Sequence, residues 1–150
     1  MHDSVTVHIE APPERIWSLV SDVTNTSRFA AETFDARWLD GATGPAVGVR
    51  FKGHVRRNGW WPPYWSLCVI DVCEPGKEFA FTVMVGGQRV NTWRYRFEPR
   101  NGGTDVTESF KLADKPAMRL YWAVAGSRRR KTNVDNMRTT LERIKASAES

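Results

Sequence analysis

The sequence predicts an α+β fold in which a curved antiparallel β-sheet of six or seven strands wraps around one long C-terminal α-helix. Two short helices are expected after the first strand. The prediction depends on two observations. Short segments rich in β-branched and aromatic residues, separated by Gly and Pro, fill residues 34–112. The last segment changes to a helical period with one long apolar stripe, which needs a large apolar partner, and only the sheet can provide it.

The N-terminal segment predicts one strand and two short helices. "SVTVHIE" alternates Val5, Val7 and Ile9 with polar residues, as a half-buried strand does. Two prolines end this strand, and Pro13 suits the first turn of a helix over residues 13–21. A further helical turn or two is expected within "TSRFAAE".

The middle of the chain predicts a meander of strands. The connectors "EPGKE", "VGGQ" and "PRNGG" place Gly and Pro between apolar runs, as in antiparallel hairpins. Neighbouring strands are therefore expected to pair with each other. The predicted strands are residues 34–39, 48–57, 64–74, 78–85, 89–99 and 104–112.

The C-terminal segment predicts a long helix that begins near Asp114 and Pro116. Its apolar side is spaced at 3.6 residues per turn, so one face is expected to be buried against the sheet. The residues predicted on this face are Leu120, Arg130, Val134, Met137, Leu141 and Ile144.

Length and charge restrict the classes of partner. The chain has 150 residues, the size of one ordinary domain, so we expect a single domain over residues 1–150. The net charge of +5 is modest, and "RRRK" at 128–131 stands without a motif that reads nucleic acid. We therefore expect no nucleic-acid partner.

The sequence predicts a cytoplasmic protein without stable membrane insertion. It contains neither an apolar run of about 18 residues nor a leader typical of export. Cys68 and Cys73 are five residues apart on one predicted strand, which would place them on opposite faces. We expect both to be reduced packing residues.

A cavity is expected between the sheet and the helix, because one helix cannot fill the space that a curved sheet of this size encloses. The inward residues follow from the alternation of each strand. They are Phe51, Val55, Phe79, Phe81, Val83, Trp93, Tyr95, Phe97, Val106, Glu108 and Phe110.

The chain contains, in this order, the phrases "APPERIWSLVSDV", "VRFKGHVRRNGWWPPYWS", "VCEPGKEFAFTV", "TWRYRFEP", "GGTDVTESF" and "NMRTTLERIK". Together they resemble the START-like, helix-grip (SRPBCC) superfamily and within it the bacterial polyketide cyclase/dehydrase-like branch. The resemblance covers nearly the whole chain. It implies a helix-grip fold with a deep cavity for apolar or amphipathic small molecules, in a family where some members cyclise or dehydrate polyketides and many only carry ligands. The superfamily has no universal set of catalytic residues, so the resemblance assigns none to this chain.

Glu108 is the first candidate site residue, because it lies in the apolar row of "GTDVTESFKL". Burial would raise its pKa and make it a general base, or an acceptor for a ligand hydroxyl. The alternatives are that this end of the strand is exposed to solvent, or that another residue pairs with the charge of Glu108. Arg130 is the candidate partner, since its helical phase matches that of Met137; the alternative is that Arg130 extends to the rim.

Aromatic residues supply the other candidate ligand contacts. Tyr95 brings a hydroxyl that would donate to a ligand oxygen, and it is the second tentative catalytic residue with Glu108. Asn91 shares its parity and is expected near the mouth of the cavity. The remaining predicted ligand-binding residues are Phe51, Val55, Phe81, Trp93, Phe110 and Val134.

The segment "NGWWPPYWS" is predicted to cover the cavity mouth. Trp60, Trp61, Tyr64 and Trp65 expose more apolar area than a turn needs, which favours a lid or a patch for self-association as a homodimer. The alternative is a loop folded onto its own hairpin.

Three functions remain open from the sequence. The first is binding or carriage of a small hydrophobic molecule such as a lipid, polyketide or aromatic metabolite. The second is a cyclase, aromatase or dehydratase that uses Glu108 and Tyr95. The third is a protein-interaction module. No metal or other cofactor is expected, because the three histidines have no second ligand at metal spacing and the glycine pairs do not precede a helix.

Overall fold

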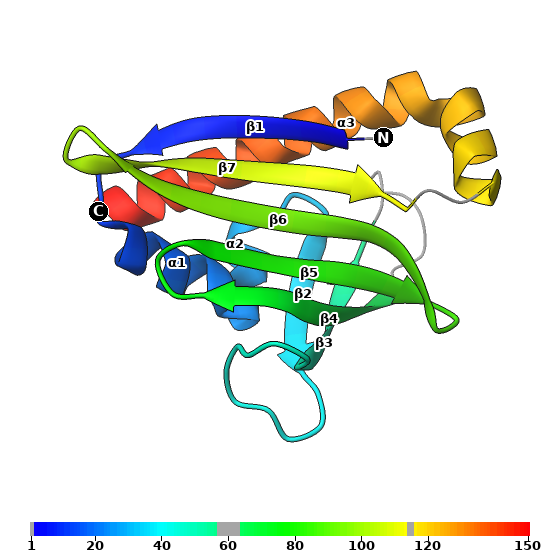
Figure 1. The fold of residues 1–150 in the computed structure, drawn as a ribbon, viewed down its shortest axis with the longest axis horizontal. Coiled ribbons are helices and arrows are strands. Elements are labelled where there is room, and N and C mark those ends of the chain that lie inside the picture. Colours follow the sequence, from blue (N-terminus) through cyan, green and yellow to red (C-terminus); the bar gives the residue numbers. More distant parts are fainter. Residues whose placement is uncertain (1, 57–63, 114–115) are drawn as a thin grey trace.

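The computed structural model describes residues 2–56, 64–113 and 116–150. These residues form one seven-stranded antiparallel sheet, two short helices with a 3₁₀ turn after the first strand, and a long C-terminal helix (Figure 1). This is the predicted fold class. The elements are β1 (His2–Ile9), α1 (Pro13–Ser21), the 3₁₀ turn (Val23–Asn25), α2 (Thr26–Phe29), β2 (Thr33–Trp38), β3 (Arg50–Val55), β4 (Tyr64–Glu74), β5 (Glu78–Val85), β6 (Gln88–Arg100), β7 (Gly103–Leu112) and α3 (Pro116–Glu149).

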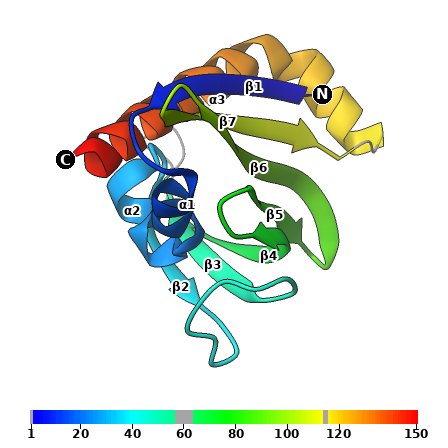
Figure 2. The ribbon, with the colours of Figure 1, turned by 60° about the vertical axis from the view of Figure 1, so that its left-hand side comes forward.

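The sheet has the strand order β1-β7-β6-β5-β4-β3-β2, so the first strand pairs with the last one and the others follow as a meander. The sheet curls, and α3 packs against β1 and β7 on its inner side (Figure 2). Helices α1 and α2 lie beside the C-terminal half of α3. No helix among the described residues is long and apolar enough to cross a membrane.

The hairpin between β6 and β7 shows how local chemistry sets the register. Asn101 and Gly102 have φ values of 51° and 80°, which Gly adopts freely and Asn tolerates. The next residue, Gly103, lies close to β1: a Cβ atom there would be 2.5 Å from the carbonyl oxygen of Ile9. A side chain at this position would push β1 away from β7.

The core lies between the sheet and the C-terminal half of α3. Met137, Leu141 and Ile144 are almost fully buried and belong to the same apolar cluster as Phe79 and Val106. The predicted stripe is too long at its N-terminal end, because Leu120 is 68% exposed. The first turns of α3 extend beyond the end of β1, where the sheet offers no surface to pack against (Figure 1).

A β-bulge in β4 corrects the expectation for the two cysteines. The register between β4 and β5 shifts between Ile70 and Val72, and Cys73 therefore pairs with the inward residue Phe79. Cys68 and Cys73 thus lie on the same face of the sheet, not on opposite faces. Both are free thiols.

Candidate functional site

A cavity of about 500 Å³ lies between the inner face of the sheet and α3. Strands β3 to β7 supply one wall, α3 supplies the opposite wall, and residues from α1 to β2 close one end. The following predicted ligand-binding residues line it: Phe51, Val55, Phe81, Trp93, Tyr95, Glu108 and Phe110.

Strand alternation and register bring the polar residues of the sheet wall together. Glu108 on β7 lies directly opposite Tyr95 on β6, and Tyr95 lies opposite Phe79 on β5. Directly opposite residues of an antiparallel pair share one face of the sheet. One carboxyl and one phenol are therefore placed side by side on a surface that is otherwise largely apolar.

The carboxyl group of Glu108 is the most perturbed acid of the site. Glu108 is only 4% exposed, and its Oε2 accepts a 2.9 Å hydrogen bond from the Tyr95 hydroxyl. Burial raises the pKa of Glu108 to about 8, although the Tyr95 hydrogen bond acts in the opposite direction. The side chain is therefore mostly a neutral carboxylic acid at pH 7.

The second oxygen of this carboxyl is available to a ligand. Oε1 of Glu108 is buried and has no hydrogen-bond partner among the described residues. Because Oε2 already accepts the hydrogen bond from Tyr95, we place the carboxyl proton on Oε1, where it can be donated. Burial and the neighbouring Glu108 raise the pKa of Tyr95, which keeps this phenol protonated as well.

Asn133 is a site residue that the sequence reasoning missed. It lines the cavity from α3, is 1% exposed, and its Oδ1 has no hydrogen-bond partner among the described residues. The signal was present, because Asn133 lies one turn before Met137 on the buried face of the helix. Asn91, expected near the mouth, also lines the cavity.

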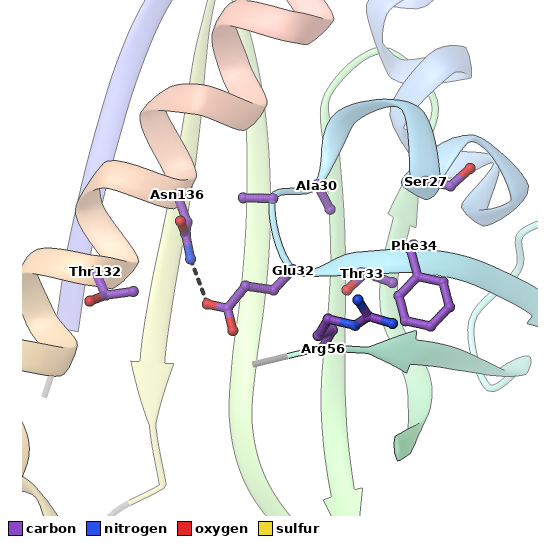
Figure 3. Close-up of a pocket in the computed structure, with 9 residues that line it drawn as sticks. Ser27, Ala30, Glu32, Thr33, Phe34, Arg56, Thr132 and Asn136 are labelled. Atoms are coloured by element: carbon purple, nitrogen blue, oxygen red, sulfur yellow. Dashed lines mark hydrogen bonds between the residues drawn. The ribbon is translucent and has the colours of Figure 1, made fainter. Parts of the chain in front are cut away.

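A second, outer pocket of about 580 Å³ adjoins the inner cavity, and Figure 3 shows the residues that line this outer pocket. The two share residues of the segment from α2 to β2, together with Asn136 of α3. At this boundary the amide nitrogen of Asn136 donates a 2.6 Å hydrogen bond to Oε1 of Glu32. Phe34 and Arg56 form the far side of the outer pocket, with the guanidinium carbon 5.7 Å from the ring centroid.

The expected pair between Glu108 and Arg130 is wrong. Nε of Arg130 lies 2.7 Å from Oδ1 of Asp3, and its side chain is 59% exposed while that of Asp3 is 7% exposed. Helical phase predicted the correct side of α3 but not the partner, because this part of the helix packs against β1, which carries Asp3. Arg130 and Val134 are not among the residues that line the cavity; Val134 is half-buried against the core.

The predicted lid residues have different positions. Tyr64 lines the cavity, whereas Trp65 lies on the outer face of the sheet and stacks on His54 with ring centroids 4.2 Å apart. The prediction that Trp65 lies at the rim of the cavity is therefore wrong, because neighbouring residues of a strand point to opposite faces. Trp60 and Trp61 lie outside the described residues.

Other chemistries have little support in the described part of the chain. No group of three His, Cys, Asp or Glu side chains that could hold a metal ion occurs among the described residues. Cys68 lines the cavity, but burial raises the pKa of its thiol to about 12. The thiol therefore stays protonated and is a poor nucleophile.

The chain matches a known protein family over residues 2–146, a family described as polyketide cyclase / dehydrase and lipid transport. The chain belongs to this family. The match covers nearly the whole sequence, so the resemblance found in the sequence is confirmed at the level of the family.

Solved structures with the same fold include protein DR_A0006 from Deinococcus radiodurans, with 18% identity, a TM-score of 0.71, and coverage of 99% of this chain and 98% of that one. The polyketide cyclase-like protein Cgl2372 from Corynebacterium glutamicum has 26% identity and a TM-score of 0.65, with 96% and 88% covered.

A third similar structure is StfQ, a di-domain ARO/CYC protein of the steffimycin biosynthetic pathway. It has 13% identity to this chain and a TM-score of 0.78, and the match covers 99% of this chain but only 50% of StfQ. No curated protein matches the chain. Together the structural matches confirm the predicted helix-grip fold of this family member.

Proposed function

We propose that the protein binds one small hydrophobic or amphipathic molecule, such as a lipid, a polyketide or an aromatic metabolite, in the cavity between the sheet and α3. The observation that carries this proposal is the carboxyl group of Glu108, which is buried in a largely apolar cavity with Oε1 unpartnered among the described residues. Keeping a polar atom out of water without a partner is costly, so a ligand oxygen is its natural complement.

The expected mode of binding follows from the two walls. Aromatic rings such as Phe81, Trp93 and Phe110 contact the apolar part of the ligand. The acid proton of Glu108 is donated to a ligand carbonyl or hydroxyl, and Tyr95 holds the carboxyl in place. A cavity of about 500 Å³ is in the size range of small-molecule sites, which favours binding over the protein-interaction module.

The test begins with the purified protein. Extraction with organic solvent followed by mass spectrometry should release a stoichiometric apolar molecule, and the emptied protein should bind N-phenyl-1-naphthylamine with a rise in its fluorescence. Ser66→Phe, which fills part of the cavity, should reduce binding at least tenfold. Its neighbour Leu67 points to the other face, so Leu67→Phe is the matched control.

Two results would contradict the binding proposal. One is the absence of both an extracted molecule and probe binding in the folded wild type. The other is a Ser66→Phe variant that binds the probe as well as the wild type while remaining folded by circular dichroism.

A second candidate function is that of a cyclase, aromatase or dehydratase. It is favoured by a carboxyl group with a pKa of about 8 beside a phenol, since general acids and bases work best near their own pKa, and by the likeness to the ARO/CYC protein StfQ. Once a ligand is known, Glu108→Gln separates the two functions. Unchanged affinity with lost turnover indicates an enzyme, and lost affinity alone indicates a carrier.

The remaining expectations stay predictions from the sequence. They are a single ligand-binding domain over residues 1–150, a cytoplasmic location, no nucleic-acid partner, and self-association as a homodimer. Size-exclusion chromatography with light scattering would test the last of these directly.

A further inference from the structure

Buried polar atoms on opposite walls of the cavity lack a partner among the described residues. On the sheet wall this atom is Oε1 of Glu108 on β7, and on the helix wall it is Oδ1 of Asn133 on α3. Two other polar residues of these walls have partners of their own in the protein, because Tyr95 donates to Glu108 and Asn136 donates to Glu32. The protein thus leaves one hydrogen-bonding group open on the sheet wall and one on the helix wall.

Asn133 is out of place in its own helix. The buried residues that follow it on the same face of α3 include Met137, Leu141 and Ile144, which are apolar, and Thr140, which carries a small hydroxyl. An Asn at such a position is less favourable for the helix than Leu or Met, and a buried carboxamide needs partners. The open atom, Oδ1 of the carboxamide, is a hydrogen-bond acceptor, so it can bond to a ligand hydroxyl.

We infer that Asn133 is a second polar ligand contact and that the ligand carries two separate oxygen functions, one for Glu108 on the sheet and one for Asn133 on the helix. This inference rests on the proposed function and narrows its ligand class. A lipid with a polar group at one end only satisfies one of the two walls. An apolar ring system with a hydroxyl or carbonyl group for Glu108 and a hydroxyl group for Asn133 satisfies both.

The experiment compares probes that share one ring system and differ only in oxygen functions. Naphthalene, 1-naphthol, 2-naphthol, and the 1,5-, 1,6-, 2,6- and 2,7-dihydroxynaphthalenes are titrated into the wild-type protein by calorimetry. At least one dihydroxy isomer should bind at least tenfold more tightly than either naphthol, because it reaches both walls. Naphthalene should bind most weakly.

Substitution then assigns the second contact. Asn133→Leu should abolish the advantage of the best dihydroxy isomer over the naphthols while naphthalene binds as well as before or better. Asp135→Leu places the same side chain on the exposed face of α3 and is the matched control, which should keep the wild-type ranking. A purely structural role of Asn133 would change the affinity for all probes alike, not the ranking.

The outcomes separate this inference from the proposed function. If the naphthalene probes bind but no dihydroxy isomer exceeds the naphthols, or if Asn133→Leu keeps the full advantage, the second contact is overturned and the binding function stands. If none of the probes binds and N-phenyl-1-naphthylamine does not bind either, the proposed function itself fails. Should Asn133→Leu not fold, the wild-type ranking alone decides.

Discussion

The hydroxyl of Tyr95 donates a 2.9 Å hydrogen bond to Oε2 of Glu108 across directly opposite positions of β6 and β7. The pair lies on the inner face of the sheet, in the wall of the cavity. Because burial of Glu108 outweighs this hydrogen bond, its pKa stands at about 8 instead of 4.5. The pair therefore acts at neutral pH as two neutral groups, one of which becomes charged just above it.

Glu108→Gln should remove a pH dependence of stability. Between pH 4.5 and about 8 the unfolded chain has lost the Glu108 proton and the folded protein has kept it, so the free energy of unfolding falls as pH rises. Each pKa unit corresponds to about 1.4 kcal/mol. The variant should match the wild type near pH 4.5 and exceed its stability by a few kcal/mol at pH 9, as measured by urea denaturation.

The control for this prediction is Glu98→Gln, on an exposed residue of β6. It should follow the wild-type pH profile throughout. An unchanged difference between Glu108→Gln and the wild type from pH 4.5 to pH 9 would show that the Glu108 carboxyl is not the group that titrates.

Tyr95→Phe should raise the pKa of Glu108 further. The Tyr95 hydroxyl stabilises the charged form of the carboxyl, and its loss leaves burial unopposed. Oε2 would also lose its donor, which should cost about 1–3 kcal/mol of stability. Carboxyl ¹³C NMR of Glu108 measures the shift directly. A pKa equal to or below that of the wild type would contradict the role assigned to the hydrogen bond.

The sequence predicted the sheet wall of the site well. In an antiparallel meander, alternation alone decides which side chains face inward, so Phe51, Tyr95 and Glu108 were placed correctly without coordinates. Alternation failed at Cys73, where one bulge residue in β4 reverses the faces. Bulges depend on the pairing of two strands, and the sequence pattern of one strand does not reveal them.

The helix wall was predicted less well, for a different reason. Helical phase gives the side of a residue but not which strand it will meet, so Arg130 was assigned to Glu108 although it pairs with Asp3 on β1. Asn133 was not included because the predicted face was traced through Arg130, Val134 and Met137. The hydrogen bond between Glu32 and Asn136 joins residues about 100 positions apart, and no local pattern signals such a contact.

Arg130→Met should destabilise the protein by leaving Asp3 buried without its cation. The Asp3 side chain is 7% exposed, and its Oδ2 already lacks a partner among the described residues. Arg130 itself is largely solvated, which reduces the loss to about 1–2 kcal/mol. Urea denaturation measures it, with Lys131→Met on the next exposed residue as the control.

A double variant tests the cause of that loss. Asp3→Asn in the Arg130→Met background removes the uncompensated charge and should recover part of the stability. If the double variant is no more stable than Arg130→Met alone, then the destabilisation comes from lost packing of the arginine side chain and not from the buried carboxylate.

Asn136→Ala should speed the exchange of a bound molecule. The 2.6 Å hydrogen bond from Asn136 to Glu32 ties α3 to the segment before β2 where the outer pocket meets the inner cavity. Removing it should raise the association and dissociation rates of N-phenyl-1-naphthylamine together, each several-fold, with little change in Kd, because the contacts inside the cavity remain. Stopped-flow fluorescence measures both rates.

Ser27→Ala, which alters the outer pocket away from this hydrogen bond, is the matched control and should leave both rates unchanged. If Asn136→Ala changes Kd by altering the dissociation rate alone, then Asn136 contacts the bound molecule itself and does not restrict its passage.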